Sequence, residues 1–96
     1  MPIAIKFISH MELMNLSMKI SLKLLATYRT NLPEGAEGSE CLIEVKEGVN
    51  VEQVLQEYGI PMGNESVVLV NGQPAGPGDL LKEDDSLCAF PAMAGG

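Results

Sequence analysis

The chain has 96 residues, of which 46% are hydrophobic and 20% are charged. This length allows one domain with a modest core, and the composition is that of a globular rather than a disordered protein. The 13 acidic residues outnumber the 6 basic ones and give a formal net charge of -7. That balance argues against nucleic acid or an anionic membrane surface as the main partner and favours a partner with a basic face.

Side chains for catalysis are scarce. His10 is the single histidine, and the sequence contains no Ser-His-Asp or Cys-His set, phosphate-binding loop or metal-ligand cluster. Cys41 and Cys88 are too few for a disulfide framework and lack the spacing of a zinc site. We therefore predict a protein that is not itself an enzyme, binds no metal, and keeps two reduced cysteines in the cytoplasm.

Residues 1–17 differ from the rest of the chain. Lys6, His10 and Glu12 interrupt their apolar residues, so they match neither a secretory signal nor a membrane span. We predict a dispensable or disordered extension, with the functional domain beginning at Met18. A short added helix or strand that packs on the domain is the alternative.

The next segments alternate between apolar and polar residues. Residues 19–25 (KISLKLL) and 41–46 (CLIEVK) each have the period of a half-buried strand, and we expect the two strands to pair. The segment between them, 30–40, is rich in Pro, Gly and acidic residues and predicts a loop. In the first strand the inward side chains are Ile20, Leu22 and Leu24.

One helix is predicted, over residues 50–58. Asn50 and Gln53 have the spacing of a capping box, and Gly59 before Ile60-Pro61 is typical of a left-handed cap and stop. A helix this short needs packing on a sheet to be stable. Its apolar residues at helical spacing are Val51, Val54, Leu55 and Tyr58.

Two further strands are predicted, over 67–70 and 86–90. Asn71-Gly72 ends the first of them, with a very short strand near 73–75. In the second, Leu87 and Ala89 should point inward, while Cys88 and Phe90 should point outward. Before it, Leu80-Leu81 can fill the core, and 83–85 form a tight acidic turn.

The last six residues, Pro91 to Gly96, form the candidate functional tail. Pro91 lacks an N–H group and should separate the tail from the preceding strand. Six extended residues span roughly 20 Å, and Gly95-Gly96 would pass a pocket too narrow for Cβ atoms. The alternative is an ordinary frayed terminus. We thus divide the chain into an extension (1–17), a domain (18–90) and a flexible tail (91–96).

The element order indicates an α+β protein with the ubiquitin-like β-grasp fold, in which a mixed sheet of four to five strands packs on one main helix. The segments KISLKLLATYR, VNVEQVLQEYGI, VVLVNG and DDSLCAFPAMAGG resemble the MoaD/ThiS family of sulfur carriers. Within that family the resemblance is strongest to the small subunit of molybdopterin synthase. Residues 83–85 replace the usual Gly-Asp turn, Pro91-Ala92 replaces Pro-Pro, and Met93 replaces Val.

The resemblance implies that a ubiquitin-activating-type enzyme adenylates the Gly96 carboxylate with ATP. A persulfide sulfur donor would then convert it to a thiocarboxylate, which donates sulfur to an acceptor such as the large subunit of molybdopterin synthase. Gly95 and Gly96 would carry the chemistry, no cofactor would be bound permanently, and Phe90 with Leu25 would form part of the docking face. The residues that guide the tail would be Phe90, Pro91, Ala92, Met93 and Ala94.

Three other functions remain open. The same activated terminus could be joined to lysines of target proteins, as in small archaeal modifiers. The protein could carry sulfur for thiamin thiazole synthesis, although those relatives tend to have less sequence between the first two strands. It could also be a β-grasp interaction module whose tail is inert.

Overall fold

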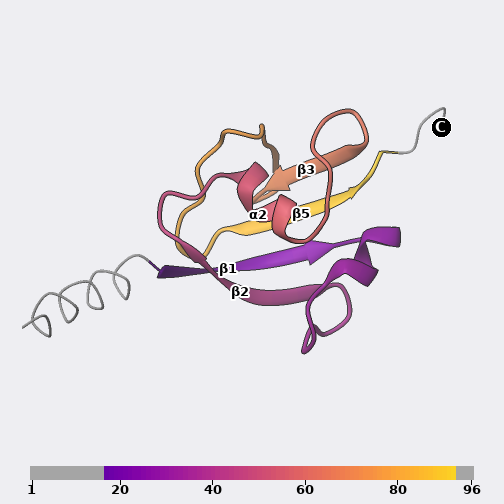
Figure 1. The fold of residues 1–96 in the computed structure, drawn as a ribbon, viewed down its shortest axis with the longest axis horizontal. Helices are drawn as coiled ribbons and strands as arrows, with labels where there is room; N and C mark the ends of the chain where they lie inside the picture. Colours follow the sequence, from indigo (N-terminus) through magenta and orange to yellow (C-terminus); the bar gives the residue numbers. More distant parts are fainter. Residues whose placement is uncertain (1–16, 93–96) are drawn as a thin grey trace, which may run out of the picture.

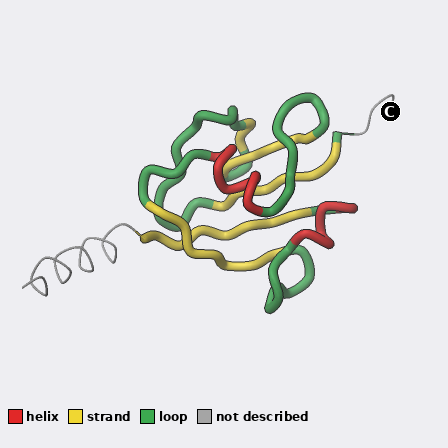
Figure 2. Tube along the Cα trace, in the orientation of Figure 1, coloured by secondary structure: helices red, strands yellow, loops and turns green. Residues whose placement is uncertain are grey.

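The computed structural model describes residues 17–92 and contains one mixed sheet with one α-helix packed on it (Figure 1). Figure 2 shows the same arrangement by element type. In chain order the elements are β1 (Ser17–Leu24), the 3₁₀ helix η1 (Ala26–Asn31), β2 (Glu40–Lys46), α2 (Val51–Glu57), β3 (Ser66–Val70), β4 (Gln73–Pro74) and β5 (Ser86–Pro91).

The strands lie in the order β2-β1-β5-β3-β4. β1 and β5 are parallel neighbours at the centre, and every other pair is antiparallel. This topology confirms the predicted ubiquitin-like β-grasp fold. The five strands include the predicted short one, which is β4.

Alternation in the strands places the core on the helix side of the sheet. Ile20, Leu22 and Leu24 of β1 are fully buried, as are Leu87 and Ala89 of β5. Because the register pairs Leu22 with Leu87 and Leu24 with Ala89, the two central strands present one continuous apolar surface to α2. The inward residues of β1 and β5 were therefore predicted correctly.

Helix α2 begins and ends as predicted. The Asn50 side chain accepts from the Gln53 N–H at 2.8 Å, and the Gln53 side chain accepts from the Asn50 N–H at 2.9 Å. At the other end Gly59 has φ +74°, the Ile60 N–H donates to Leu55, and the Gly59 N–H donates to Gln56. These two bonds form a Schellman motif, which ends the helix after two turns.

The acidic turn at 83–85 is held by its own side chains. Asp84 takes the left-handed conformation, with φ +70°, in a turn where the family resemblance leads one to expect glycine. The Asp85 carboxylate accepts from the Lys82 N–H at 2.8 Å and from the Asn71 side-chain amide at 2.9 Å. These bonds fix the entry into β5.

The structure differs from the sequence-based expectations in three places. β1 begins at Ser17, the last residue of the predicted extension 1–17, and the rest of that extension, 1–16, lies outside the described residues. Residues 26–31 form η1, which was not predicted. Leu81 is buried as expected, but Leu80 is 64% exposed, because only one of two adjacent side chains in the extended segment before β5 can point inward.

Candidate functional site

The predicted site residues other than Leu25 lie in the last part of the central strand β5 and directly after it. Phe90 and Pro91 lie in β5 and Ala92 follows directly, all three half-buried. Met93, Ala94, Gly95 and Gly96, which would carry and guide the chemistry, lie outside the described residues. The described part of the site is therefore the root of the tail and the sheet face beside it.

Pro91 does not separate the chain from the sheet, so that prediction was wrong. Pro91 pairs with Ser66 of β3, and the Ala92 N–H donates to the Glu65 carbonyl at 2.9 Å. The reason is the direction of the missing N–H. In an antiparallel pair the backbone groups of successive residues point alternately to opposite sides, and those of Pro91 point toward β1, away from β3.

β1 ends at Leu24, opposite Ala89, so it does not extend as far as Pro91. The Leu25 N–H still donates to the Ala89 carbonyl at 3.1 Å, but the Leu25 carbonyl accepts from Tyr28 at 3.1 Å. That bond begins η1. A parallel ladder would next need an N–H from β5 that donates to the Leu25 carbonyl, and Pro91 occupies that position. The Leu25 carbonyl instead accepts from the Tyr28 N–H.

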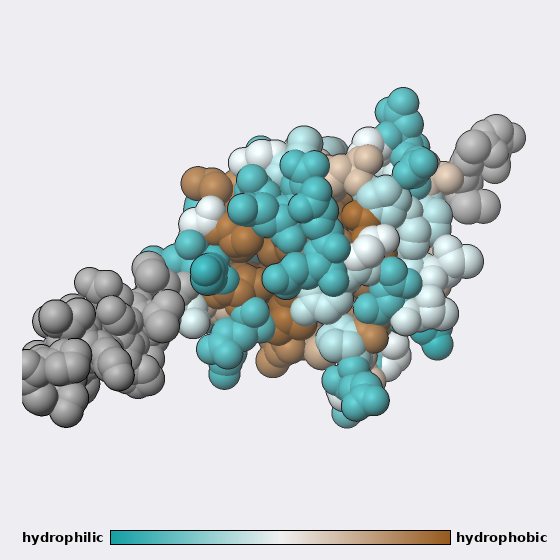
Figure 3. Space-filling model, in the orientation of Figure 1, coloured by the Kyte–Doolittle hydropathy of each residue, from teal (hydrophilic) through white to brown (hydrophobic). Residues whose placement is uncertain are grey.

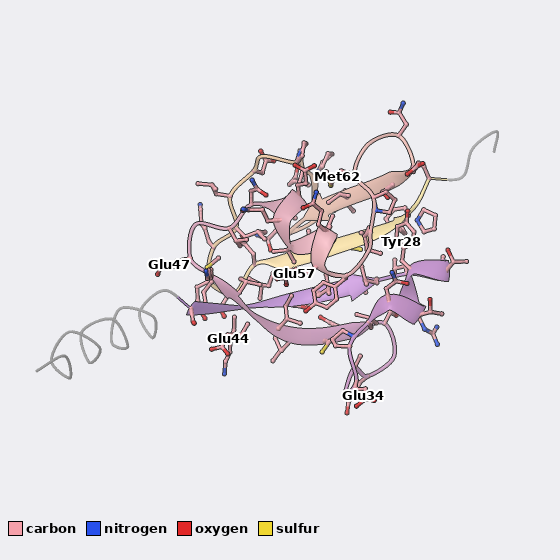
Figure 4. The ribbon with its side chains drawn as sticks, viewed as in Figure 1. Tyr28, Glu34, Glu44, Glu47, Glu57 and Met62 are labelled. Carbon is pink, nitrogen blue, oxygen red and sulfur yellow. The ribbon has the colours of Figure 1, made fainter. Side chains whose placement is uncertain are left out.

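Tyr28 joins η1 to the root of the tail, a link that sequence reasoning missed. The Ser66 hydroxyl donates to the Pro61 carbonyl at 2.5 Å, so the Tyr28 hydroxyl is the donor in its 2.7 Å contact with Ser66 Oγ. The Tyr28 hydroxyl also lies 3.3 Å from the Glu65 carbonyl, the same oxygen that Ala92 bonds. Figure 4 places Tyr28 between η1 and the end of β5.

The outer face of the sheet, opposite α2, carries apolar side chains next to this root. The register pairs Phe90 with Val67 and Cys88 with Leu69, and all four are half-buried. The β1–β5 register, continued by one residue, places half-buried Leu25 beside Phe90. Phe90 and Leu25 are therefore brought together on one face.

Cys88 is not poised as a nucleophile. Burial raises the pKa of its thiol, and nearby Lys23, its partner in the β1–β5 register, offsets only part of that rise. Within residues 17–92 there is no cluster of three or more side chains that could hold a metal ion. No helix among these residues is long and apolar enough to span a membrane. The described part of the site is therefore an apolar, half-buried sheet face beside the last described residue of the tail, Ala92.

The chain was compared with protein-family models and with curated proteins. Residues 23–96 match the model of the ThiS family. No match was found among curated proteins.

Several solved structures share the fold. HVO 2177 of Haloferax volcanii has a TM-score of 0.70 at 23% identity, over 83% of this chain and 88% of that one. The putative molybdopterin converting factor, subunit 1, of Pyrococcus furiosus has a TM-score of 0.63 at 23% identity, over 79% and 99%. Small archaeal modifier protein 1 of H. volcanii has a TM-score of 0.64 at 19% identity, over 79% and 99%.

Proposed function

The chain belongs to the ThiS family, and from that premise we propose that it is a sulfur carrier whose Gly96 carboxylate becomes a thiocarboxylate. We further propose that the sulfur is used to make molybdopterin, the organic part of the molybdenum or tungsten cofactor. The observation that supports this most is the course of β5. It carries the chain from the centre of the sheet to Ala92 beside an apolar face, with four residues still to follow.

The proposed chemistry needs no side chain of this protein. An oxygen of the Gly96 carboxylate attacks the α-phosphorus of ATP in the partner, and pyrophosphate leaves. The terminal sulfur of a donor persulfide then attacks the acyl carbon and AMP leaves, which gives an acyl disulfide. A second thiol attacks the donor-side sulfur of that disulfide and releases the thiocarboxylate. Adenylation is required because a carboxylate is otherwise a poor acyl donor.

The described residues would serve positioning. The outer-face residues Leu25, Val67, Leu69 and Phe90 form an apolar surface that an adenylating enzyme and an acceptor synthase subunit can both cover. The bond from Ala92 to Glu65 and the bond from Tyr28 to Ser66 hold the root of the tail in one direction. Such pre-organisation reduces the entropy lost when the tail enters a partner. We place this function in the cytoplasm, where such partners and reduced cysteines would occur.

Protein modification is the second candidate. It is favoured by the similarity to small archaeal modifier protein 1, whose TM-score of 0.64 is close to the 0.63 of the molybdopterin converting factor. The acyl-adenylate is common to both functions. They differ in whether a sulfur or a lysine amine attacks the acyl carbon.

Intact mass spectrometry of the protein isolated from its own cells tests the proposal. We expect the mass increase of one oxygen replaced by sulfur, located at Gly96 by fragmentation and absent from a variant lacking Gly95 and Gly96. An unmodified carboxylate together with lysine-linked conjugates would instead establish the modifier. A terminus that is never modified, in cells that make molybdopterin, would refute both functions.

A further inference from the structure

The outer edge of β2 carries backbone groups with no partner among the described residues. The Leu24 N–H donates to the Ser39 carbonyl at 2.9 Å, which fixes the phase of the β1–β2 ladder. Because backbone direction alternates along an antiparallel strand, Leu42 and Glu44 direct their N–H and C=O groups away from β1. Apart from a 3.5 Å contact from the Cys41 thiol to the Leu42 carbonyl, these groups are open.

The open stretch is short and has defined ends. At the start of β2 the loop that precedes it covers the edge, since Glu37 and Glu40 exchange two backbone hydrogen bonds of 3.0 and 3.1 Å. At its end the Lys46 carbonyl accepts from the Val49 N–H at 3.2 Å, whereas the Lys46 N–H has no acceptor within residues 17–92. The open edge therefore runs from Leu42 to the N–H of Lys46.

A groove of about 420 Å³ adjoins this edge on the helix side, between β2 and α2. Its apolar surface comes from Val45, Val49 and Val54, of which the first two are half-buried and partly accessible. Figure 3, which views this side, shows apolar surface exposed between the hydrophilic side chains of α2 and β2. The groove is completed by Ser17, Glu44, Lys46, Gln53 and Glu57.

The opposite side of the same edge is also apolar. Leu42 is 73% exposed, more than any other large hydrophobic side chain among residues 17–92. By strand alternation it points to the outer sheet face, while Val45 points to the groove. A strand added to this edge would therefore bury apolar surface on both of its faces.

The charge around the groove is mainly negative. Glu44 and Glu57 line it from β2 and α2, and exposed Glu47 follows β2. Among the described residues two cations oppose these three carboxylates, namely Lys46 of the lining and Lys19, the cross-strand partner of Glu44. In Figure 4 the Glu44 and Glu57 labels lie on either side of β2, while Glu34 lies on the loop away from them. An occupant with Lys or Arg side chains would be attracted to this rim.

We propose that the open edge of β2 and the adjoining groove, from Leu42 to Lys46 with Val45, Val49 and Val54, bind an extended basic peptide segment of a partner protein as an added strand. Main-chain hydrogen bonds to Leu42, Glu44 and Lys46 give affinity, and alternate apolar side chains of the peptide fill the groove. The site lies at the opposite edge of the sheet from β4 and makes no use of Gly96. It is thus a second interaction surface, independent of the sulfur-carrier function.

A second copy of this chain fits the edge less well. Two-fold pairing centred on Glu44 places two Glu44 carboxylates opposite each other, which is destabilising. Pairing centred on Ile43 brings Lys46 of one copy opposite Glu40 of the other, whose backbone groups are already bonded to Glu37. A partner segment with positive charge has neither conflict.

The test is a titration of the ¹⁵N-labelled full chain with the peptide RKVTVTVKR, followed by amide chemical shifts. We expect saturable shifts at the amides of Leu42, Glu44 and Lys46 and at the methyl groups of Val45 and Val49. The matched peptide EEVTVTVEE should bind at least about 10-fold more weakly, because its charges oppose the acidic rim.

Two pairs of variants sharpen the test. Glu57→Lys should weaken binding of the basic peptide about 3- to 10-fold, whereas Glu34→Lys, which changes the net charge equally, should leave it within about 1.5-fold. Glu44→Pro removes an open edge N–H without removing a bond to β1 and should weaken binding more than about 10-fold. Glu44→Gln removes the charge alone and should have a smaller effect.

Four results of the peptide titrations would overturn the proposal. They are shifts centred on Phe90 and the outer sheet face, equal binding of the two peptides, no saturable shift up to about 1 mM peptide, and equal effects of Glu57→Lys and Glu34→Lys. Edge shifts that depend on protein concentration without peptide would assign the edge to a second copy of the chain and overturn it too.

Discussion

The phenolic hydroxyl of Tyr28 offers the most direct test of how the tail root is held. Tyr28→Phe removes one donor and leaves the ring in place. The lost hydrogen bond is the 2.7 Å contact with Ser66 Oγ, with the weaker 3.3 Å contact to the Glu65 carbonyl. Ser66 keeps its bond to Pro61, so no partner is left wholly unsatisfied.

A neutral hydrogen bond of this kind contributes about 1 kcal/mol to the free energy of unfolding. For a domain of this size that corresponds to a fall in Tm of about 4–8 °C. Because Glu65 also accepts from Ala92, we expect a local effect in addition. A global loss of this size makes amide hydrogen exchange of Leu87 about 5-fold faster. Exchange of Ala92 should accelerate by more than that factor, because the local loss adds to the global one.

Tyr58→Phe is the matched control. Tyr58 is also half-buried, and its hydroxyl makes no hydrogen bond within residues 17–92, so its removal should change the free energy of unfolding by less than about 0.5 kcal/mol. Thermal unfolding and amide exchange by NMR measure both effects. Equal losses in the two variants, or an unchanged Ala92 exchange rate in Tyr28→Phe, would refute the role assigned to Tyr28.

Two further predictions concern the helix and the thiol. Asn50→Ala removes the capping box of α2 and should lower the free energy of unfolding by about 1 kcal/mol in denaturant titrations, whereas Asn50→Asp should retain most of it; equal losses would contradict the capping role. Because burial raises the pKa of the Cys88 thiol, a smaller fraction is thiolate at mildly alkaline pH, and alkylation of Cys88 should be slower in the folded protein than in urea. Peptide mass mapping of alkylation against pH measures this, and an equal rate in both states would contradict it.

Elements with a strong local pattern were predicted well. The alternation in 19–25, 41–46 and 86–90 defines which side chains are buried, because strand geometry turns alternate residues to opposite faces. Asn50, Gln53 and Gly59 define the ends of α2, because capping requires particular side chains and a positive φ at fixed positions. The short strand β4 followed from the Asn71-Gly72 turn.

The candidate site was predicted only in part. Phe90 and Leu25 were placed on one face from strand alternation and the family resemblance, and the structure brings them together. Tyr28 and Ser66 were missed because they lie 38 residues apart and no local pattern connects them. The open edge of β2 was also missed, since the sequence does not reveal which strand is outermost.

Sequence alone thus determined the order of the elements, their inward faces and the limits of the helix, since each depends on residues a few positions apart. Only the tertiary structure decided the parallel pairing of β1 with β5, the direction of the missing N–H at Pro91 and the contact of Tyr28 in η1 with Ser66. These features depend on which strand lies beside which. Pro91 has the same fixed φ in either arrangement, but whether it breaks a ladder depends on the neighbour that its nitrogen faces.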